Sequence, residues 1–429
     1  MRRISDWISN NGLTDRSLIL TIFVFTLSIG VSIVSQAIVG NSLGLENFGR
    51  FSSIYARVTI LSGLLTWGFD ISALKFVSFY FQSGNTKELR RFAVYSIFLT
   101  VLGTLAFTIV WSFAYWMGWS VLAEFTPIMV LATIFWTITR LLAALLRASG
   151  MQVASLVVDR IVRDGLLAAF CLWMIFGPHK SATLTSVVDA LAISCAIALV
   201  FSILTFAFGN KPVENQKNEP ISSRRLWFTT SLSLWGANIL ELTFSRAEVI
   251  LLAFYGQATN AGLFAVLLAV SNLLLLPVLA LNVVFQPRFA ALNSPGGGQK
   301  LRQEARRFVL SALPITLLIG AVVLTQPKFF LALFGAHEIA SETLWCLVAI
   351  VVFRMALAPI GARAPILQMN DGHLTLAAIY ALGVFLKTAL LLSAISTGSL
   401  GWVTGISIAS TLLIQLLIYI SSIKLLNRA

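Results

Sequence analysis

The chain has 429 residues, of which 58% are hydrophobic and only 11% are charged. Because soluble domains carry about 25% charged residues, this composition excludes a soluble enzyme or binding domain and predicts an all-α polytopic membrane protein. The formal net charge of +13 does not indicate a nucleic-acid partner, because most lysines and arginines fall between the apolar runs.

Twelve apolar runs are long enough to cross a membrane as helices, which takes about 20 residues each. The first run is too long for the core of a cleaved signal peptide, so we expect it to remain as the first span. The expected spans are Ser17–Gly40, Ser53–Phe79, Phe92–Tyr115, Val121–Leu145, Val153–Gly177, Leu184–Phe208, Trp227–Phe254, Ala261–Phe285, Phe308–Leu324, Glu342–Ile366, Leu374–Ala394 and Gly401–Leu426.

The connections between these spans alternate in charge. One set carries most of the basic residues, whereas the opposite set holds little more than Arg50, Lys180 and Lys328. Since basic residues are retained on the cytoplasmic side, we expect both termini to be cytoplasmic.

The longest polar connection, 209–226, contains two prolines and mixed charge, as expected of a linker. It divides the chain into a cytoplasmic N-terminal segment (1–16), a six-helix N-lobe (17–208) and a six-helix C-lobe (227–429).

Two short stretches repeat each other at half the chain length. Leu43–Phe51 and Tyr255–Phe264 each contain a glycine, a few mostly polar or small residues, a second glycine, one residue and a phenylalanine. A motif that recurs at this distance indicates an internal duplication. Six spans separate the copies, so the repeats are parallel, and each copy is expected to form a tight outward turn between the first two helices of its lobe.

Charged residues inside spans are candidate functional residues, because each costs about 2.5–3.5 kcal/mol at a helix centre. Arg246, Arg354 and Lys387 have no acidic neighbour that faces them in their own helices, since Glu248 is only two residues from Arg246. They indicate either a water-filled cavity that faces an anion or pairing across helices. Arg140 lies 214 residues before Arg354 and is its expected counterpart in the N-lobe.

The fifth span contains a cluster of four charges, Asp159, Arg160, Arg163 and Asp164. The pairs Asp159/Arg163 and Arg160/Asp164 have i,i+4 spacing, so the helix could neutralise itself. Structural pairing and a role in a cavity both remain open. In the second span, Asp70 is poorly spaced for pairing with Lys75, so we expect its partner in another helix.

The sequence offers no pattern for a metal site or cofactor. Cys171, Cys195 and Cys346 lie singly in apolar runs, and the three histidines are isolated. We therefore expect no cofactor and no disulfide framework.

Several stretches resemble the polysaccharide and O-antigen exporters of the multidrug/oligosaccharidyl-lipid/polysaccharide (MOP) superfamily. They are Leu43–Phe51, Gly68–Phe76, Arg246–Gly256, Ala261–Val266 and Gln286–Leu292. The resemblance implies two six-helix lobes around a central cleft. It also implies flipping of a polyprenyl-pyrophosphate-linked oligosaccharide between the leaflets of the bacterial inner membrane.

The resemblance further implies that basic residues in the cleft hold the pyrophosphate. Arg246 fits this role best, because the family's seventh helix lines the cleft. Arg354, Lys387, Arg160 and Arg163 are weaker candidates for the substrate site. Asp70 and Glu241 are candidate ion-coupling residues. The expected partners are the lipid-linked oligosaccharide, the bilayer and other proteins of polysaccharide assembly.

Three alternatives differ from this interpretation. A drug/cation antiporter on the same fold would need acidic residues, and Asp70, Glu241 and Glu248 are outnumbered by bases in the spans. A membrane enzyme such as an O-antigen polymerase or ligase would need a large outward loop, and the expected outward loops are short. A non-transporting scaffold is the remaining case. We therefore expect a transporter and not an enzyme.

Overall fold

The computed structural model describes residues 16–119, 125–177, 182–208, 224–291, 298–337, 340–369 and 372–428, and every regular element in these ranges is helical. The predicted N-terminal segment, except for Arg16, and most of the predicted linker lie outside the described residues. The last three residues of that linker, 224–226, already belong to a helix.

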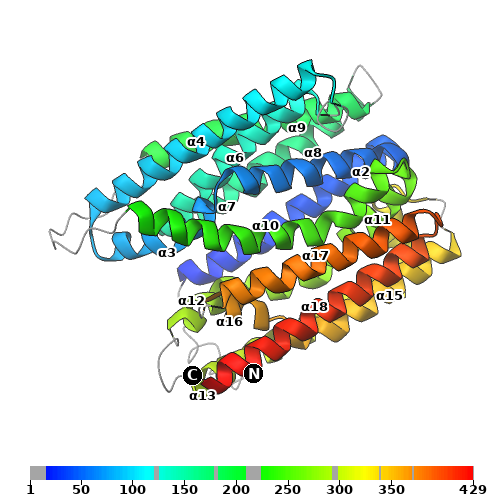
Figure 1. Ribbon diagram of the computed structural model, residues 1–429. Helices are drawn as coiled ribbons and strands as arrows, with labels where there is room; N and C mark the ends of the chain where they lie inside the picture. The colour runs from blue at the N-terminus through cyan, green and yellow to red at the C-terminus, as the bar shows by residue number, and fades with distance from the viewer. Residues whose placement is uncertain are drawn as a thin grey trace.

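The described helices follow the two halves predicted by the duplication (Figure 1). The N-lobe contains α2 (Arg16–Leu65), α3 (Phe69–Gln82), α4 (Thr86–Trp116), α6 (Pro127–Ala148), α7 (Gln152–Leu156), η1 (Val157–Val162), α8 (Arg163–Phe176) and α9 (Leu184–Phe208). The C-lobe contains α10 (Arg224–Phe254), α11 (Ala258–Asn272), η2 (Leu273–Leu275), α12 (Leu276–Ala291), α13 (Gly298–Thr325), α14 (Pro327–Ala332), α15 (Ser341–Leu357), η3 (Ala358–Ile360), α16 (Arg363–Met369), α17 (His373–Ile395) and α18 (Leu400–Arg428).

These helices account for twelve crossings. Nine helical segments in the described ranges are long and apolar enough to span a bilayer, and Leu20–Leu65, with 46 residues, is long enough for two crossings. The fifth crossing is divided among α7, η1 and α8, and the seventh, α10, carries charged residues. The predicted twelve-helix fold is therefore confirmed.

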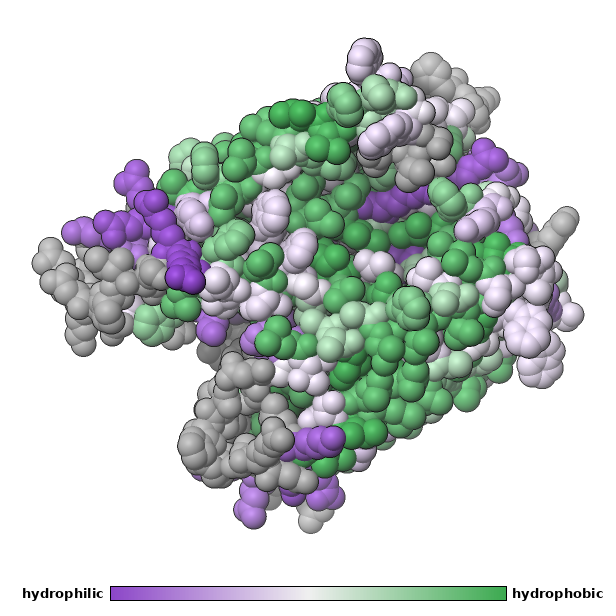
Figure 2. All heavy atoms as spheres, viewed as in Figure 1, coloured by the Kyte–Doolittle hydropathy of each residue, from purple (hydrophilic) through white to green (hydrophobic). Residues whose placement is uncertain are grey.

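Many apolar side chains lie on the molecular surface. Many large hydrophobic residues of α4, α9, α13 and α18 are exposed. Figure 2 shows hydrophobic residues over the centre of the visible face and hydrophilic residues gathered toward the helix ends. This pattern is expected where lipid, rather than water, surrounds the helices.

The first repeated motif turns more tightly than the predicted span ends, Gly40 and Ser53, imply. Only Gly44 leaves the helical conformation, with φ 71° and ψ 166°, and the helix resumes at Leu45. The polar residues that follow continue the helix, where Arg50 and Glu46 form an i,i+4 ion pair of 2.6 Å. In the second copy, Gly256 adopts φ 77° and α11 begins at Ala258. Both turns are therefore shorter than expected.

The second crossing is broken where the sequence predicts one continuous helix. Trp67 and Gly68 adopt positive φ values of 52° and 75°, and α3 begins at Phe69. At the break, the carbonyl of Leu64 accepts one hydrogen bond from Trp67 N at 3.3 Å and a second from Trp235 Nε1 at 2.9 Å. Trp67 also stacks on Trp235, with ring centroids 6.2 Å apart. Helix α10 of the C-lobe thus adds a side-chain hydrogen bond to the backbone at the break.

Candidate functional site

A polar cavity of about 410 Å³, hereafter the N-lobe cavity, lies among helices of the N-lobe and α10. Its walls come from α2, α3, α6, η1, α8 and α10. Of the described residues that line it, five are arginines and two are aspartates: Arg140, Arg147, Arg160, Arg163, Arg246, Asp70 and Asp159. The formal charge of this lining is strongly positive.

A second cavity of about 270 Å³, hereafter the C-lobe cavity, lies among α10, α11, α15, α17 and α18. Its charged lining consists of Glu241, Arg246, Glu248, Arg354 and Lys387. Amide, hydroxyl and phenol groups, such as those of Asn272 and Tyr380, complete its polar surface.

Arg246 lines both cavities. It also lines a narrow pocket between them, together with Tyr55 and Asn272. Within the described ranges, its guanidinium makes no ion pair or hydrogen bond. The arginine that the sequence favours most is therefore at the meeting point of the two cavities, with its donors available.

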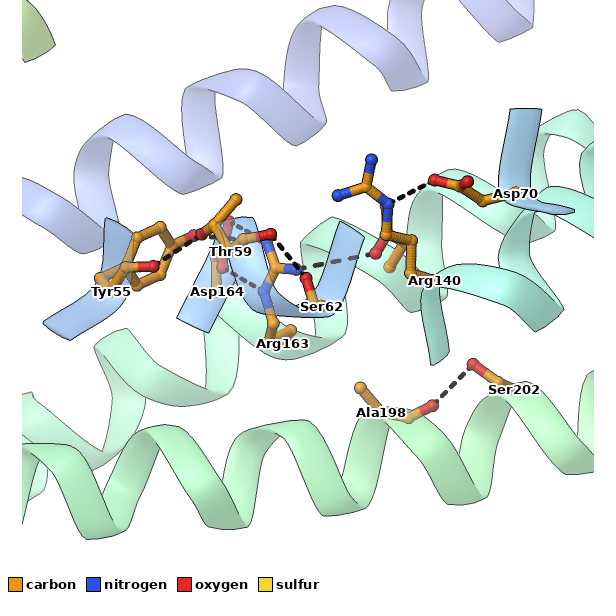
Figure 3. Close-up of polar contacts among 10 residues, drawn as sticks. Tyr55, Thr59, Ser62, Asp70, Arg140, Arg163, Asp164, Ala198 and Ser202 are labelled. Atoms are coloured by element: carbon orange, nitrogen blue, oxygen red, sulfur yellow. Dashed lines mark hydrogen bonds and ion pairs between the residues drawn. The ribbon is translucent and has the colours of Figure 1, made fainter. Parts of the chain in front are cut away.

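Arg163 is also on the wall of the N-lobe cavity, but its guanidinium is already bound. Its Nε and one terminal nitrogen contact the two carboxylate oxygens of Asp164 at 2.8 and 3.3 Å (Figure 3). The same terminal nitrogen donates to Tyr55 Oη at 3.4 Å, and the guanidinium carbon lies 3.9 Å from the ring centroid of Trp136. These contacts favour a structural role over direct substrate contact.

One of the two predicted pairs in this cluster is present. Asp159 and Arg163 approach to 3.6 Å, as the i,i+4 spacing predicts. Asp164 pairs with its neighbour Arg163 instead of with Arg160, whose guanidinium lies 5.5 Å from the ring centroid of Phe25. Part of the cluster lies in a π-helix, Val157–Val162, in which the turn is wider than in an α-helix.

Asp70 finds its partner in another helix, as expected. Arg140 Nε of α6 lies 2.6 Å from Asp70 Oδ2, and Thr66 Oγ1 donates to Asp70 Oδ1 at 3.0 Å. The 214-residue offset singled out Arg140 only as the counterpart of Arg354. Nothing in the spacing of the N-lobe charges indicated that α3 and α6 would bring Asp70 and Arg140 together.

No protein-family model matches the chain, and a search of curated proteins finds no match. Solved structures are similar over nearly the whole length. An inward-facing multidrug resistance MATE family transporter of the MOP superfamily aligns with a TM-score of 0.72 and 14% identity, covering 95% of this chain and 98% of that one. The fold is that of MOP transporters.

Two further MOP structures support this assignment. An outward-facing MATE transporter aligns with a TM-score of 0.66 and 14% identity, covering 96% of each chain. A MOP superfamily transporter from Pyrococcus furiosus aligns with a TM-score of 0.64 and 14% identity, covering 95% of this chain and 96% of that one. At this identity the similarity establishes the fold, and with it the predicted pair of six-helix lobes.

Within this MOP fold, Lys387 is paired across helices, which was the alternative to an anion-facing lysine. Its Nζ lies 2.5 Å from Glu248 Oε1 and donates to the Phe244 carbonyl at 2.8 Å. Ser407 Oγ also donates to Glu248 Oε1, at 2.5 Å. Both charged side chains are almost fully buried, at 3% and 1% exposure. Lys387 therefore has less capacity for a ligand than the sequence suggests.

The remaining predicted residues of the C-lobe, Arg354 and Glu241, both line its cavity. Across the residues that the structure describes, the Arg354 guanidinium has no ion pair or hydrogen bond. The MOP fold thus brings Arg246 and Arg354 to one cavity from α10 and α15, and it adds Arg140, Arg147 and Tyr55 to the N-lobe cavity.

Proposed function

We propose that the chain is a transporter that flips a polyprenyl-pyrophosphate-linked oligosaccharide, an O-antigen or exopolysaccharide repeat unit, to the periplasmic leaflet by alternating access. The observation that carries the proposal is the surplus of arginine over aspartate around the N-lobe cavity. A cavity with this lining attracts anions and repels cations.

The chemistry of the proposed substrate fits this lining. A diphosphate cannot enter hydrocarbon without compensating charge. Guanidinium groups match phosphate oxygens in a bidentate manner, and Arg246 has its donors free among the described residues. In this mechanism the polar head passes through the cavities between the lobes, while the polyprenyl tail stays in the bilayer.

The proposal also covers the location of the protein and the residues that would couple transport to an ion gradient. The basic connections support a location in the inner membrane of a bacterial cell with both termini in the cytoplasm. Asp70 and Glu241 line the N-lobe and C-lobe cavities respectively and are the acidic candidates for a coupling ion. Other proteins of polysaccharide assembly are proposed partners.

A drug/cation antiporter is the second candidate, since MATE structures named for multidrug resistance share the fold. The Pyrococcus furiosus structure is described as having a binding pocket of reverse polarity, which suggests a different function for that protein. The arginine-rich N-lobe cavity of the present chain favours an anionic substrate over a cationic drug.

Substitution of Arg246 tests the proposal. We expect Arg246→Gln to block surface polysaccharide and to cause the lipid-linked precursor to accumulate inside the cell at an unchanged protein level. Arg50→Gln is the matched control, because Arg50 forms an exposed i,i+4 ion pair with Glu46. Normal polysaccharide in the Arg246→Gln strain would contradict the proposal. Sensitivity of a deletion strain to cationic dyes, with normal polysaccharide, would favour the antiporter.

A further inference from the structure

Arg140 lines the N-lobe cavity, and the two terminal nitrogens of its guanidinium, the fork, have no hydrogen-bond partner among the described residues. Its Nε is held by Asp70 Oδ2 at 2.6 Å, and the other oxygen of that carboxylate accepts from Thr66 at 3.0 Å. Asp70 is 6% exposed, whereas the side chain of Arg140 is 21% exposed. Figure 3 shows both terminal nitrogens of Arg140 directed away from Asp70. The carboxylate therefore fixes the guanidinium plane without using its outer donors.

Arg163 differs from Arg140, because each of its three guanidinium nitrogens has a partner. Its Nε donates to Asp164, and one terminal nitrogen donates to both Asp164 and Tyr55. Its other terminal nitrogen approaches Asp159. Over the described part of the chain, neither terminal nitrogen of Arg140 makes a hydrogen bond. Four N–H groups are left to face the cavity.

A glycine makes room for this fork. A Cβ atom at Gly63 would lie 3.2 Å from Arg140 Nη1 and 3.2 Å from Leu242 Cδ1. Any side chain at position 63 would therefore compete with the guanidinium for space. The tip of Arg140 and the Leu242 side chain of α10 therefore both approach the second crossing at Gly63.

Arg246 follows Leu242 by one turn on the same face of α10, where Cβ atoms are about 5–6 Å apart. Leu242, Arg140 and Arg246 all line the N-lobe cavity. One arginine from each lobe thus approaches the same space.

We infer that Arg140 and Arg246 together bind the diphosphate of the substrate across the two lobes, and that Asp70 is the positioning residue for Arg140. Each phosphate can accept a bidentate pair of hydrogen bonds from one guanidinium. This inference rests on the proposed function, and it replaces an ion-coupling role for Asp70 with an orienting one.

Binding of inorganic pyrophosphate to the purified full-length protein tests the inference by calorimetry at constant ionic strength. The double variant Asp70→Asn/Arg140→Gln removes the pair without changing net charge and without leaving a buried charge unpaired. We expect it to bind pyrophosphate about tenfold or more weakly than the wild type. Arg140→Lys keeps the charge but loses the fork, so its affinity should fall between the two.

The double variant Glu46→Gln/Arg50→Gln is the matched control. It removes an exposed ion pair of the same length and also leaves net charge unchanged, so its affinity should equal that of the wild type. Equal affinity of the Asp70→Asn/Arg140→Gln variant and the wild type, at the same melting temperature, would overturn the inference.

The two hypotheses fail in different ways. Loss of pyrophosphate binding in Arg246→Gln but not in Asp70→Asn/Arg140→Gln would reject Arg140 as a ligand and leave the proposed function intact. Failure of the wild type to bind pyrophosphate, with normal surface polysaccharide in Arg246→Gln cells, would reject both. If Asp70→Asn/Arg140→Gln bound pyrophosphate normally but lost transport driven by an ion gradient, Asp70 would be a coupling residue and the inference would be wrong.

Discussion

Gly49 and Gly262 pack backbone against backbone where the two copies of the repeated motif cross. A Cβ atom on Gly49 would overlap the carbonyl of Ala258 and lie 2.6 Å from the amide nitrogen of Gly262. A Cβ atom on Gly262 would overlap the carbonyl of Leu45 and lie 3.2 Å from the amide nitrogen of Gly49. The motif expected to form two separate turns therefore forms one contact between α2 and α11, and so between the lobes.

Substitution of Gly262 by alanine should destabilise this crossing. The added methyl group meets main-chain atoms, which cannot rotate away as a flexible side chain could. We expect a loss of about 1–3 kcal/mol in the free energy of unfolding, measured as a lower melting temperature in detergent. Gly236→Ala in α10 is the control, because a Cβ there meets nothing within 4 Å. An unchanged or raised melting temperature in Gly262→Ala would contradict the contact.

The buried pair of Glu248 and Lys387 predicts a non-additive effect on stability. Removing one charge leaves the other buried without its partner, so Lys387→Met alone should cost about 3–5 kcal/mol. The double variant Glu248→Gln/Lys387→Met should recover much of this loss, because no unpaired charge remains. A double-mutant cycle of melting temperatures measures the coupling. Additive losses would show that the pair contributes no interaction of its own.

Arg163 and Arg246 should respond differently to the same change. Arg163→Gln leaves Asp164 buried with a weaker partner and removes the stacking on Trp136, so it should lower stability by several kcal/mol, about 3–5. Arg246→Gln should affect transport at a nearly unchanged melting temperature, because its guanidinium contacts no described partner. The measurement pairs thermal melts with precursor accumulation. Equal melting temperatures for the two variants would argue against a structural role for Arg163.

Thiol labelling can test the predicted orientation. Cys171, Cys195 and Cys346 are buried, so the native background of labelling should be low. Glu46→Cys follows the bend between the first two crossings, and Lys87→Cys begins the third. With cytoplasmic termini, a membrane-impermeant maleimide should label Glu46→Cys in intact cells and Lys87→Cys only after the inner membrane is opened. The reverse pattern would invert the topology.

The sequence by itself determined the number of crossings and the duplication. Run length decides the crossings because every helix must span the same hydrocarbon thickness. The bounds of α9 agree with the predicted Leu184–Phe208, and the other spans differ mainly at their ends and at internal breaks such as Trp67–Gly68. Those breaks depend on contacts with another helix, as Leu64 with Trp235 shows.

Only the tertiary structure decided which charged side chains have a partner among the described residues and which do not. Helical spacing can judge partners within one helix, but the partner of Asp70 is 70 residues away and that of Lys387 lies in α10. Asp164 also pairs with its neighbour Arg163 rather than with Arg160, which the i,i+4 spacing did not predict. Arg246 and Arg354 have no described partner, and both line the C-lobe cavity. Arg140 and Arg246 line the N-lobe cavity together, because α6 and α10 both contribute to its wall.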